Sequence, residues 1–424
     1  MNIAINILFL LLLTSWAIKK PTRFVIGYFI YVTAYFGFFS RDILVANIEF
    51  GTFISNLIPL FCAVMYRNKL KDKTSIYIVI ALLLFYVYGL FKPVIDGRQN
   101  IIMSVISSKA HTFYFFVIYV ITLKDSIDFK KVFNFIFYTS IYYSALYIIN
   151  GFGIGIRPPV FIKGDGIQCC FDSFMTFSLF YLHSQLCHIK KKAIYTVILI
   201  IGIYLGDFFS LISTSIILLP FLSILIKNWK NKANIIIFAA IIAVPIFIAF
   251  SFFQESQTYK EITANQSNAI ETRSAHNEFR WHLIDKEYNW GYGFIHKDSH
   301  FLSFFTNSDS QYMNSLSFID SGYTDLMGKF GLYGTILFLL IPLYFIKQGF
   351  KNSSNAFCII FIIQMFAVNI TWSVFTYQMG IILLALAYSY ILRNNNSKFA
   401  ITKGLKDNQS IVAHKELNTY NYGK

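Results

Sequence analysis

The chain is divided by apolar runs that recur from its first residues to Leu392. Most of them are long enough to cross a bilayer, which needs roughly 20 mostly apolar residues in one helix. They lie at about 3–18, 24–39, 43–65, 74–91, 101–123, 132–150, 167–187, 193–206, 209–226, 234–253, 324–346, 356–374 and 377–392. With 56% hydrophobic and 13% charged residues, the chain has too little polar surface to cover them in water. The sequence therefore predicts an all-α polytopic membrane protein with about 13 transmembrane helices (12–14).

The basic residues are distributed unevenly between the loops. Most of the 36 Lys and Arg residues lie in alternate loops, in clusters such as Lys19-Lys20 and Lys190–Lys192, and in the C-terminal tail. Such loops are retained in the cytoplasm, which predicts an N-terminus outside and a tail inside. A nucleic-acid-binding protein would need one continuous basic face, so the net charge of +15 indicates topology and no nucleic-acid partner.

Four segments follow from this pattern. Residues 1–253 carry ten predicted helices with short loops, 254–323 form a large extracytoplasmic loop, 324–392 carry the C-terminal helices, and 393–424 form a cytoplasmic tail. The tail is rich in Asn and Lys, and we expect it to be disordered. The large loop is the only long polar segment, so chemistry on a polar substrate is expected there. ATP and nucleotide sugars are not available on that side of the membrane.

Two regions of the outer side carry candidate arginines. Arg157 lies in a loop that Pro and Gly residues hold in a non-helical shape next to the membrane. It is either an interfacial contact with lipid headgroups or a bidentate contact with a diphosphate. In the large loop, a helix predicted over 268–289 places Arg273, Asn277 and Arg280 on one face.

The two arginine stems of that helix would be about 10 Å apart, a separation that suits two phosphates, or a phosphate and a sugar. Trp281 lies on the flank, where an indole ring can stack on a pyranose. A solvated helix with incidental arginines is the alternative.

Further along, Gly291 and Gly293 predict a tight turn, and Asp320 precedes the point where the chain re-enters the membrane. Asp320 either caps the next helix or takes part in catalysis, and Asp325 could join it in either role. The spacing of His296 and His300 has no HExxH-like partner set, so we expect no metal site. The five cysteines have no metal-type spacing and make no disulfide framework.

These residues, in this order, resemble the bacterial O-antigen polymerase and ligase superfamily, polytopic C-type glycosyltransferases that use undecaprenyl diphosphate-linked glycans. The family pattern is an Arg, an amphipathic helix, a Gly-x-Gly turn, and a His-Asn or Asp element entering a Gly-x-x-Gly helix. It corresponds to Arg273, the helix to Trp290, Gly291 with Gly293, and Asp320 with Gly331 and Gly334. Arg157 resembles the earlier outer-loop Arg of the family.

The sequence departs from the family pattern at two positions. Asp320 stands where ligases of this family place His-Asn, and Asn277 stands where an aromatic is expected one turn after Arg273. The first departure favours the polymerase branch over the ligase. A flippase for lipid-linked oligosaccharides is a third possibility, although it would need charges deep within many spans.

The resemblance implies a metal-independent polymerase without a cofactor, which joins repeat units of a surface polysaccharide (O-antigen or capsule). It would lie in the bacterial inner membrane with its active site facing the periplasm. Arg273, Arg280 and Asp320 would be catalytic, with Asp320 as the base, and Arg157, Asn277, Trp281, Gly291 and Gly293 would bind substrate. Its partners would be undecaprenyl diphosphate-linked oligosaccharide, membrane lipid and a chain-length regulator.

Overall fold

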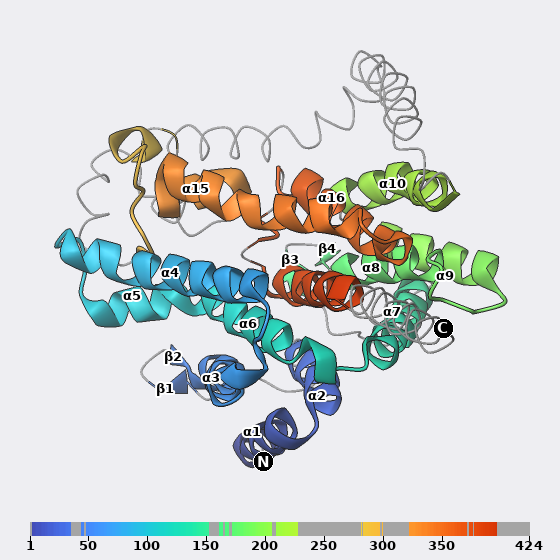
Figure 1. Ribbon diagram of the computed structural model, residues 1–424, viewed down its shortest axis with the longest axis horizontal. Coiled ribbons are helices and arrows are strands. Elements are labelled where there is room, and N and C mark those ends of the chain that lie inside the picture. Colours follow the sequence, from blue (N-terminus) through green and yellow to red (C-terminus); the bar gives the residue numbers. More distant parts are fainter. Residues whose placement is uncertain are drawn as a thin grey trace, which may run out of the picture.

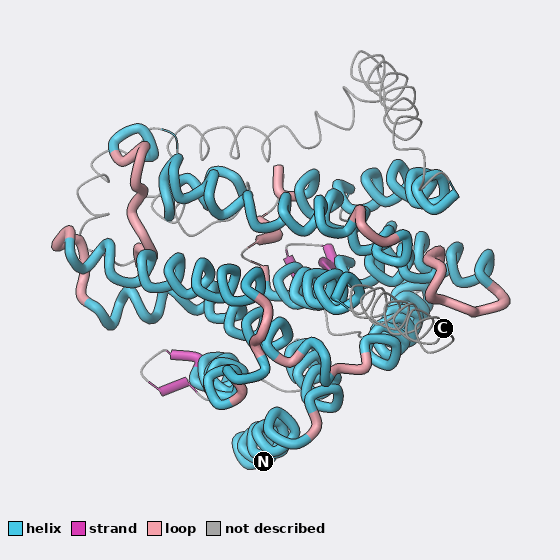
Figure 2. Tube along the Cα trace, viewed as in Figure 1, coloured by secondary structure: helices cyan, strands magenta, loops and turns pink. Residues whose placement is uncertain are grey.

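A computed structural model of the chain places most of the predicted helices. It describes residues 2–34, 44–45, 48–151, 161–163, 166–168, 172–205, 209–227, 281, 283–296, 299, 322–370, 373–375 and 377–396. Apart from two short hairpins, the regular structure of these residues is helical (Figures 1 and 2). The predicted helical class is therefore confirmed for the described part of the chain.

The helices begin and end close to the predicted apolar runs. They are α1 (Asn2–Lys19), α2 (Pro21–Ala34), α3 (Phe50–Met65), α4 (Lys73–Ile95), α5 (Ile101–Ser107), α6 (Tyr114–Thr122), α7 (Phe129–Gly151), α8 (Asp172–Leu182), α9 (Lys192–Leu205), α10 (Phe209–Lys227), α15 (Gly322–Gly349) and α16 (Ala356–Val368). A last helix covers 378–396. Short 3₁₀ turns are η1 (Arg67–Lys69), η2 (Ser108–Phe113), η3 (Lys124–Ser126) and η5 (Ser353–Asn355).

Among the described residues, four helical stretches are long and apolar enough to cross a membrane. These are Lys73–Ile95, Ile101–Thr122, Phe129–Ile149 and Gly322–Gly349. Shorter apolar helices accompany them, so the chain has the transmembrane-helix character expected from the sequence. The run at 234–253 lies outside the described residues, as does most of the large loop, and the count of thirteen spans stays a prediction.

Two predicted spans begin later than expected. The run at 43–65 starts as a hairpin of β1 (Leu44–Val45) and β2 (Ile48–Glu49), and the helix follows only at Phe50. The run at 167–187 likewise overlaps the hairpin of β3 (Phe161–Lys163) and β4 (Gly166–Gln168), and α8 starts at Asp172. Both hairpins contain β-branched residues around short polar links, a local pattern that favours strands.

A third predicted span, at 101–123, is interrupted in its middle by η2. Hydroxyl groups there bond back to nearby carbonyls: Ser108 Oγ donates to Val105 O (2.8 Å) and Thr112 Oγ1 donates to Lys109 O (2.6 Å). Such bonds compete with the regular helical ladder, and the backbone tightens to 3₁₀ between α5 and α6. This places His111 at an irregular point inside an apolar span.

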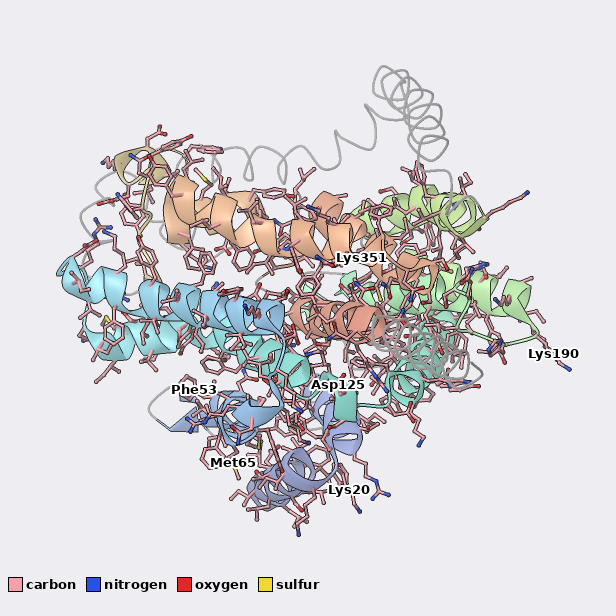
Figure 3. All side chains as sticks on the ribbon, in the orientation of Figure 1. Lys20, Phe53, Met65, Asp125, Lys190 and Lys351 are labelled. Carbon is pink, nitrogen blue, oxygen red and sulfur yellow. The ribbon has the colours of Figure 1, made fainter. Side chains whose placement is uncertain are left out.

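The connections that are rich in Lys and Arg are joined to one another by hydrogen bonds. The ammonium of Lys124, after α6, donates to Asp72 before α4 (2.6 Å), and Arg393 donates to the carbonyl of Ile127 (2.5 Å). The same connections are linked by Tyr66 OH to Ile18 O, Asp128 N to Thr22 Oγ1, Ser353 Oγ to Gln185 Oε1, and Asn394 Nδ2 to Ser354 Oγ. Figure 3 labels Lys20, Asp125, Lys190 and Lys351 from these connections, all to the right of the α4–α5 turn. We call this set of connections the basic end.

The basic end gives a direct test of orientation. A periplasm-active reporter fused near Ser267 should be functional, and one fused near Lys230 should be silent, because positively charged loops are retained in the cytoplasm. Enzyme activity of each fusion, normalised to the amount of fusion protein, is the measurement. A fusion after Lys351 serves as a second cytoplasmic point. The reverse pattern would contradict the predicted orientation.

Candidate functional site

Away from the basic end, the segment 283–296 is docked between α4 and α15 (Figure 1). Its backbone amides bond outward to both helices: Tyr292 N to Gly328 O (2.8 Å), Gly293 N to Lys329 O (2.8 Å) and Phe294 N to Gly89 O (2.7 Å). In return, Leu332 N of α15 donates to Tyr288 O (2.7 Å). We call 283–296 the strap, since it ties two distant helices together.

Three glycines make this docking possible. Gly291, Gly293 and Gly331 have φ of 69°, 74° and 63°, values that side chains other than glycine rarely adopt. Gly331 interrupts α15 with ψ of −172°, and a Cβ there would lie 2.3 Å from the carbonyl oxygen of Asn289. The turn itself lies just before these two glycines, at 287–290, and not at Gly291–Gly293 as predicted. Gly291 packs directly against the backbone around Gly331.

On the opposite side, the strap fits into a notch in α4. The buried ring of Phe294 lies over Gly89, where a Cβ would come within 2.4 Å of the ring. Gly293 approaches Pro93 in the same way, since a Cβ on Gly293 would be 2.5 Å from Pro93 Cδ. Sequence reasoning missed this contact. Its signal was a lone glycine inside an apolar helix, which indicates close approach of another group.

Polar groups at the α4–α5 turn hold the strap in place. Arg98 forms an ion pair with Glu287 of the strap, and a second one with Asp96 (3.2 Å). Its guanidinium lies over the ring of Tyr292, 4.6 Å from the centroid. Burial raises the pKa of the Tyr292 phenol to about 12, although the charge of Arg98 opposes this. Gln99 adds hydrogen bonds to the backbone on both sides, at Phe294 O (2.6 Å) and His296 N (2.8 Å).

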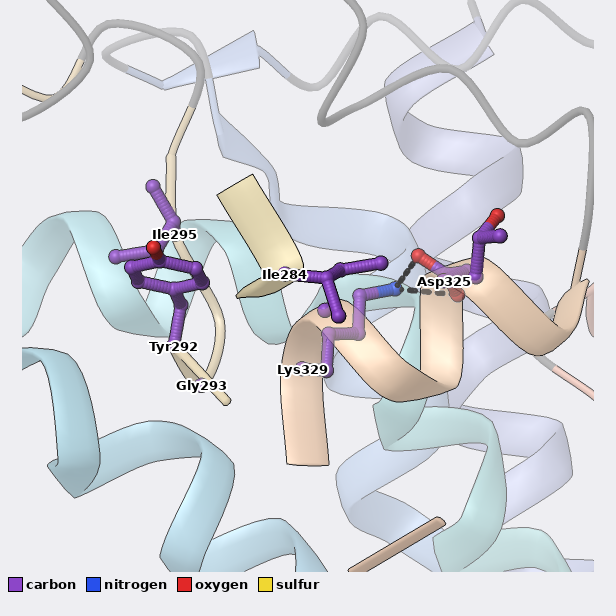
Figure 4. A pocket seen from close by; sticks show the side chains of 8 residues that line it. Ile284, Tyr292, Gly293, Ile295, Asp325 and Lys329 are labelled. Atoms are coloured by element: carbon purple, nitrogen blue, oxygen red, sulfur yellow. Dashed lines mark hydrogen bonds and ion pairs between the residues drawn. The ribbon is translucent and has the colours of Figure 1, made fainter. Parts of the chain in front are cut away.

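A small cavity lies between the strap and the first turns of α15 (Figure 4). Its volume is about 40 Å³, room for about three water molecules. The lining residues are Ile284, Tyr292, Gly293, Ile295, Thr324, Asp325, Gly328 and Lys329. The cavity is thus apolar on the strap side and charged on the α15 side.

The charges belong to an ion pair within α15. Lys329 Nζ is 2.6 Å from Asp325 Oδ1 and 2.8 Å from Oδ2. Ser373, in the segment after α16, donates to Oδ2 at 3.2 Å. Asp325 was considered as a helix cap or a site residue, and in the structure its oxygens accept from two side chains.

A buried histidine packs against the strap and α15. The ring of His111 is 4.3 Å from that of Phe294 and 6.0 Å from that of Phe330, between centroids. Neither of its nitrogens has a hydrogen-bond partner among the described residues. Nearby, Tyr114 OH donates to Phe375 O (2.5 Å), which ties α6 to the segment that carries Ser373.

Most of the predicted site residues lie outside the described residues. This holds for Arg157, Arg273, Asn277, Arg280 and Asp320. Of the others, Trp281 is described and exposed, while Gly291 and Gly293 lie in the strap with positive φ. Within the described residues, no group of three or more His, Cys, Asp or Glu side chains could hold a metal.

The helix predicted over 268–289 ends earlier than expected. It is helical at 281 and 283–286 and becomes a turn at 287–290. The reason lies in α15: the carbonyls of Tyr288 and Asn289 accept from Leu332 and Tyr333, so they are directed away from their own helix.

No model of a known protein family matches this sequence, and no curated protein is significantly similar to it. The chemistry of the site therefore has to follow from its own groups. These are a carboxylate, an ammonium and hydroxyls around a small cavity, at the end of apolar helices and away from the basic end. Such a set can bind a hydroxyl group and move its proton.

Proposed function

We propose that the protein is a repeat-unit polymerase of a bacterial surface polysaccharide, either O-antigen or capsule. It transfers the growing glycan from undecaprenyl diphosphate to a new lipid-linked repeat unit. It acts at the outer face of the inner membrane, without metal or cofactor. A chain-length regulator is the expected protein partner.

The observation that carries this proposal is the docking of Gly291 and Gly293 on α15, where Gly291 approaches Gly331 and the amide of Gly293 donates to Lys329 O. These glycines belong to separate pieces of the pattern that resembles the O-antigen polymerase and ligase superfamily. In the structure the pieces touch through backbone atoms, since a Cβ on Gly291 would lie 2.4 Å from Gly331 N. Motif residues that meet in the folded structure support the resemblance more strongly than the same residues would if they lay far apart.

The reaction has three requirements, and the proposed residues meet two of them. The acceptor hydroxyl and the anomeric carbon must be aligned, the hydroxyl proton must go to a carboxylate, and the departing diphosphate must be stabilised. Arg157, Arg273 and Arg280 are proposed for the diphosphate, because fixed cations near a low-dielectric boundary act strongly on developing charge. The resemblance implies Asp320 as the carboxylate. The donor already carries its leaving group, so no nucleotide is consumed.

Deletion of the gene tests this function. We expect surface glycan with a single repeat unit attached, because a polymerase joins units while another enzyme attaches them. The measurement is the glycan ladder on a gel, with a plasmid copy of the gene as the control. Loss of all attached glycan would favour the ligase, which transfers glycan to lipid A core. Lipid-linked units accumulating on the cytoplasmic face would favour the flippase.

A further inference from the structure

The ion pair of Asp325 and Lys329 is largely shielded from solvent. The side chain of Asp325 is 7% exposed and that of Lys329 is 19% exposed. Burying two charges is unfavourable, and an apolar pair in their place is often as stable. Asp325 lies in the first turn of α15 and Lys329 lies one turn further in, and ionisable residues in membrane-spanning helices indicate a functional site by default. We therefore expect this pair to have a function in addition to stabilising α15.

The cavity beside the pair indicates that this function is ligand binding. Asp325, Lys329 and the hydroxyl residue Thr324 line its α15 side, while Ile284 and Ile295 line the strap side (Figure 4). A carboxylate that accepts, an ammonium that donates and a hydroxyl that does either match an alcohol group of a ligand. At about 40 Å³ the cavity holds one such group rather than a whole sugar.

Among the described residues, buried polar groups of two other elements that pack near α15 are also left without partners. Both ring nitrogens of His111 and both side-chain polar atoms of Asn369 lack a hydrogen-bond partner within the described part of the chain. Lys329 lies close enough to act electrostatically on His111, and the backbone of Asn369 accepts from the first amide of α15 (2.9 Å). Unsatisfied buried polar atoms are rare and point to a bound water or ligand.

We infer that the cavity beside Asp325 and Lys329 binds the acceptor hydroxyl of the lipid-linked sugar, and that Asp325 takes its proton. The inference rests on the proposed function and gives Asp325 the role that the resemblance implies for Asp320. The hydroxyl O–H bond breaks and its proton moves to the Asp325 carboxylate. The oxygen forms the new bond to the anomeric carbon, and the bond from that carbon to the diphosphate breaks with its electron pair on the diphosphate. Lys329 and Ser373 hold the carboxylate in place.

The test uses full-length protein in detergent and lipid-linked repeat units extracted from the deletion strain. We expect Asp325→Asn to lower the rate of polymer formation by about a hundredfold or more, as for removal of a general base. Sodium formate should restore part of the activity of Asp325→Ala, because formate fits the vacated space and can accept a proton. A purely structural aspartate would not respond to formate.

Asp128→Asn is the control. Asp128 pairs with Lys131 three residues later at 3.2 Å, at the basic end and away from the strap. We expect it to retain activity. If Asp325→Asn does not fold, the double variant Asp325→Asn/Lys329→Gln removes both charges together and should fold but remain inactive.

Separate outcomes overturn the two proposals. Wild-type protein that makes no polymer contradicts the proposed function and this inference with it. Active wild type together with an active Asp325→Asn, an active double variant, or no formate response contradicts the inference alone.

Discussion

Gly331→Ala is expected to release the strap from α15 and to destabilise the protein by about 3 kcal/mol. The backbone at Gly331 has φ of 63° and ψ of −172°, a region that is almost restricted to glycine. The new Cβ would also meet three backbone atoms of Asn289 and Trp290 at 2.3–2.4 Å. Backbone cannot move aside as a flexible side chain can, so the docking itself has to give way.

Gly328→Ala is the control for this prediction. Gly328 lies one turn earlier in α15, and a Cβ there meets nothing within 4 Å. Alanine favours a helix by about 1 kcal/mol over glycine, so this variant should be as stable as wild type or more so. Thermal unfolding in detergent and proteolysis of the strap are the measurements. Equal stability of Gly331→Ala and Gly328→Ala would contradict the docking.

Asp72→Asn should have the second large effect, at the basic end. Asp72 caps α4 by accepting from Ser75 N (2.8 Å) and pairs with Lys124, whose side chain is only 2% exposed. Asparagine keeps an oxygen for the cap but leaves a buried ammonium without its counter-charge. We expect a loss of about 2–4 kcal/mol, measured as the unfolding midpoint in detergent. Asp72→Asn/Lys124→Met should recover much of it, because the buried charge is then absent.

Asp128→Asn provides the comparison. Asp128 also accepts from a backbone amide at a helix start, Lys131 N (3.2 Å), but its partner Lys131 is 75% exposed. An exposed pair contributes about 0–1 kcal/mol, so this variant should unfold near the wild-type midpoint. A similar loss in Asp72→Asn and Asp128→Asn would contradict the role of burial.

The pair at Asp72 also predicts a pH dependence. Burial alone would raise the pKa of the Asp72 carboxyl, but hydrogen bonds from Lys124 and Ser75 lower it below 3.8. Since the folded pKa is the lower one, the stabilisation is present above about pH 4 and is lost as the pH falls through the folded value. Asp72→Asn should lack this part of the acid sensitivity.

Helices were predictable because each apolar run is a local property of the sequence. The two late helix starts were missed for a reason of the same kind: hydropathy does not distinguish an apolar strand such as Leu44–Val45 from the first turn of a helix. The interruption at η2 had a visible signal in the Ser and Thr residues around His111. The length of the apolar run at 101–123 nevertheless favoured one uninterrupted helix.

The site was predictable in part. A positive φ at Gly291 and Gly293 follows from the residue type, whereas the contact of Gly291 with Gly331 depends on how α15 packs. Gly89 and Arg98 were missed because their partners in the strap lie far away along the chain. A carboxylate at the start of α15 was expected, but only packing shows which groups meet Asp325.

The strap has a consequence for the order of biosynthesis. Its partners on α4 and the following turn precede it by 189 residues from Arg98 to Glu287 and by 202 residues from Tyr88 to Trp290. At about 5–20 residues per second, a ribosome needs roughly 10–40 s to cross that interval. During this time Phe294 is not yet present to pack over Gly89 of α4. Docking of the strap on both helices must also follow the synthesis of α15. A nascent chain that stops before residue 281 would therefore contain α1–α10 but would lack the contacts between the strap and α4.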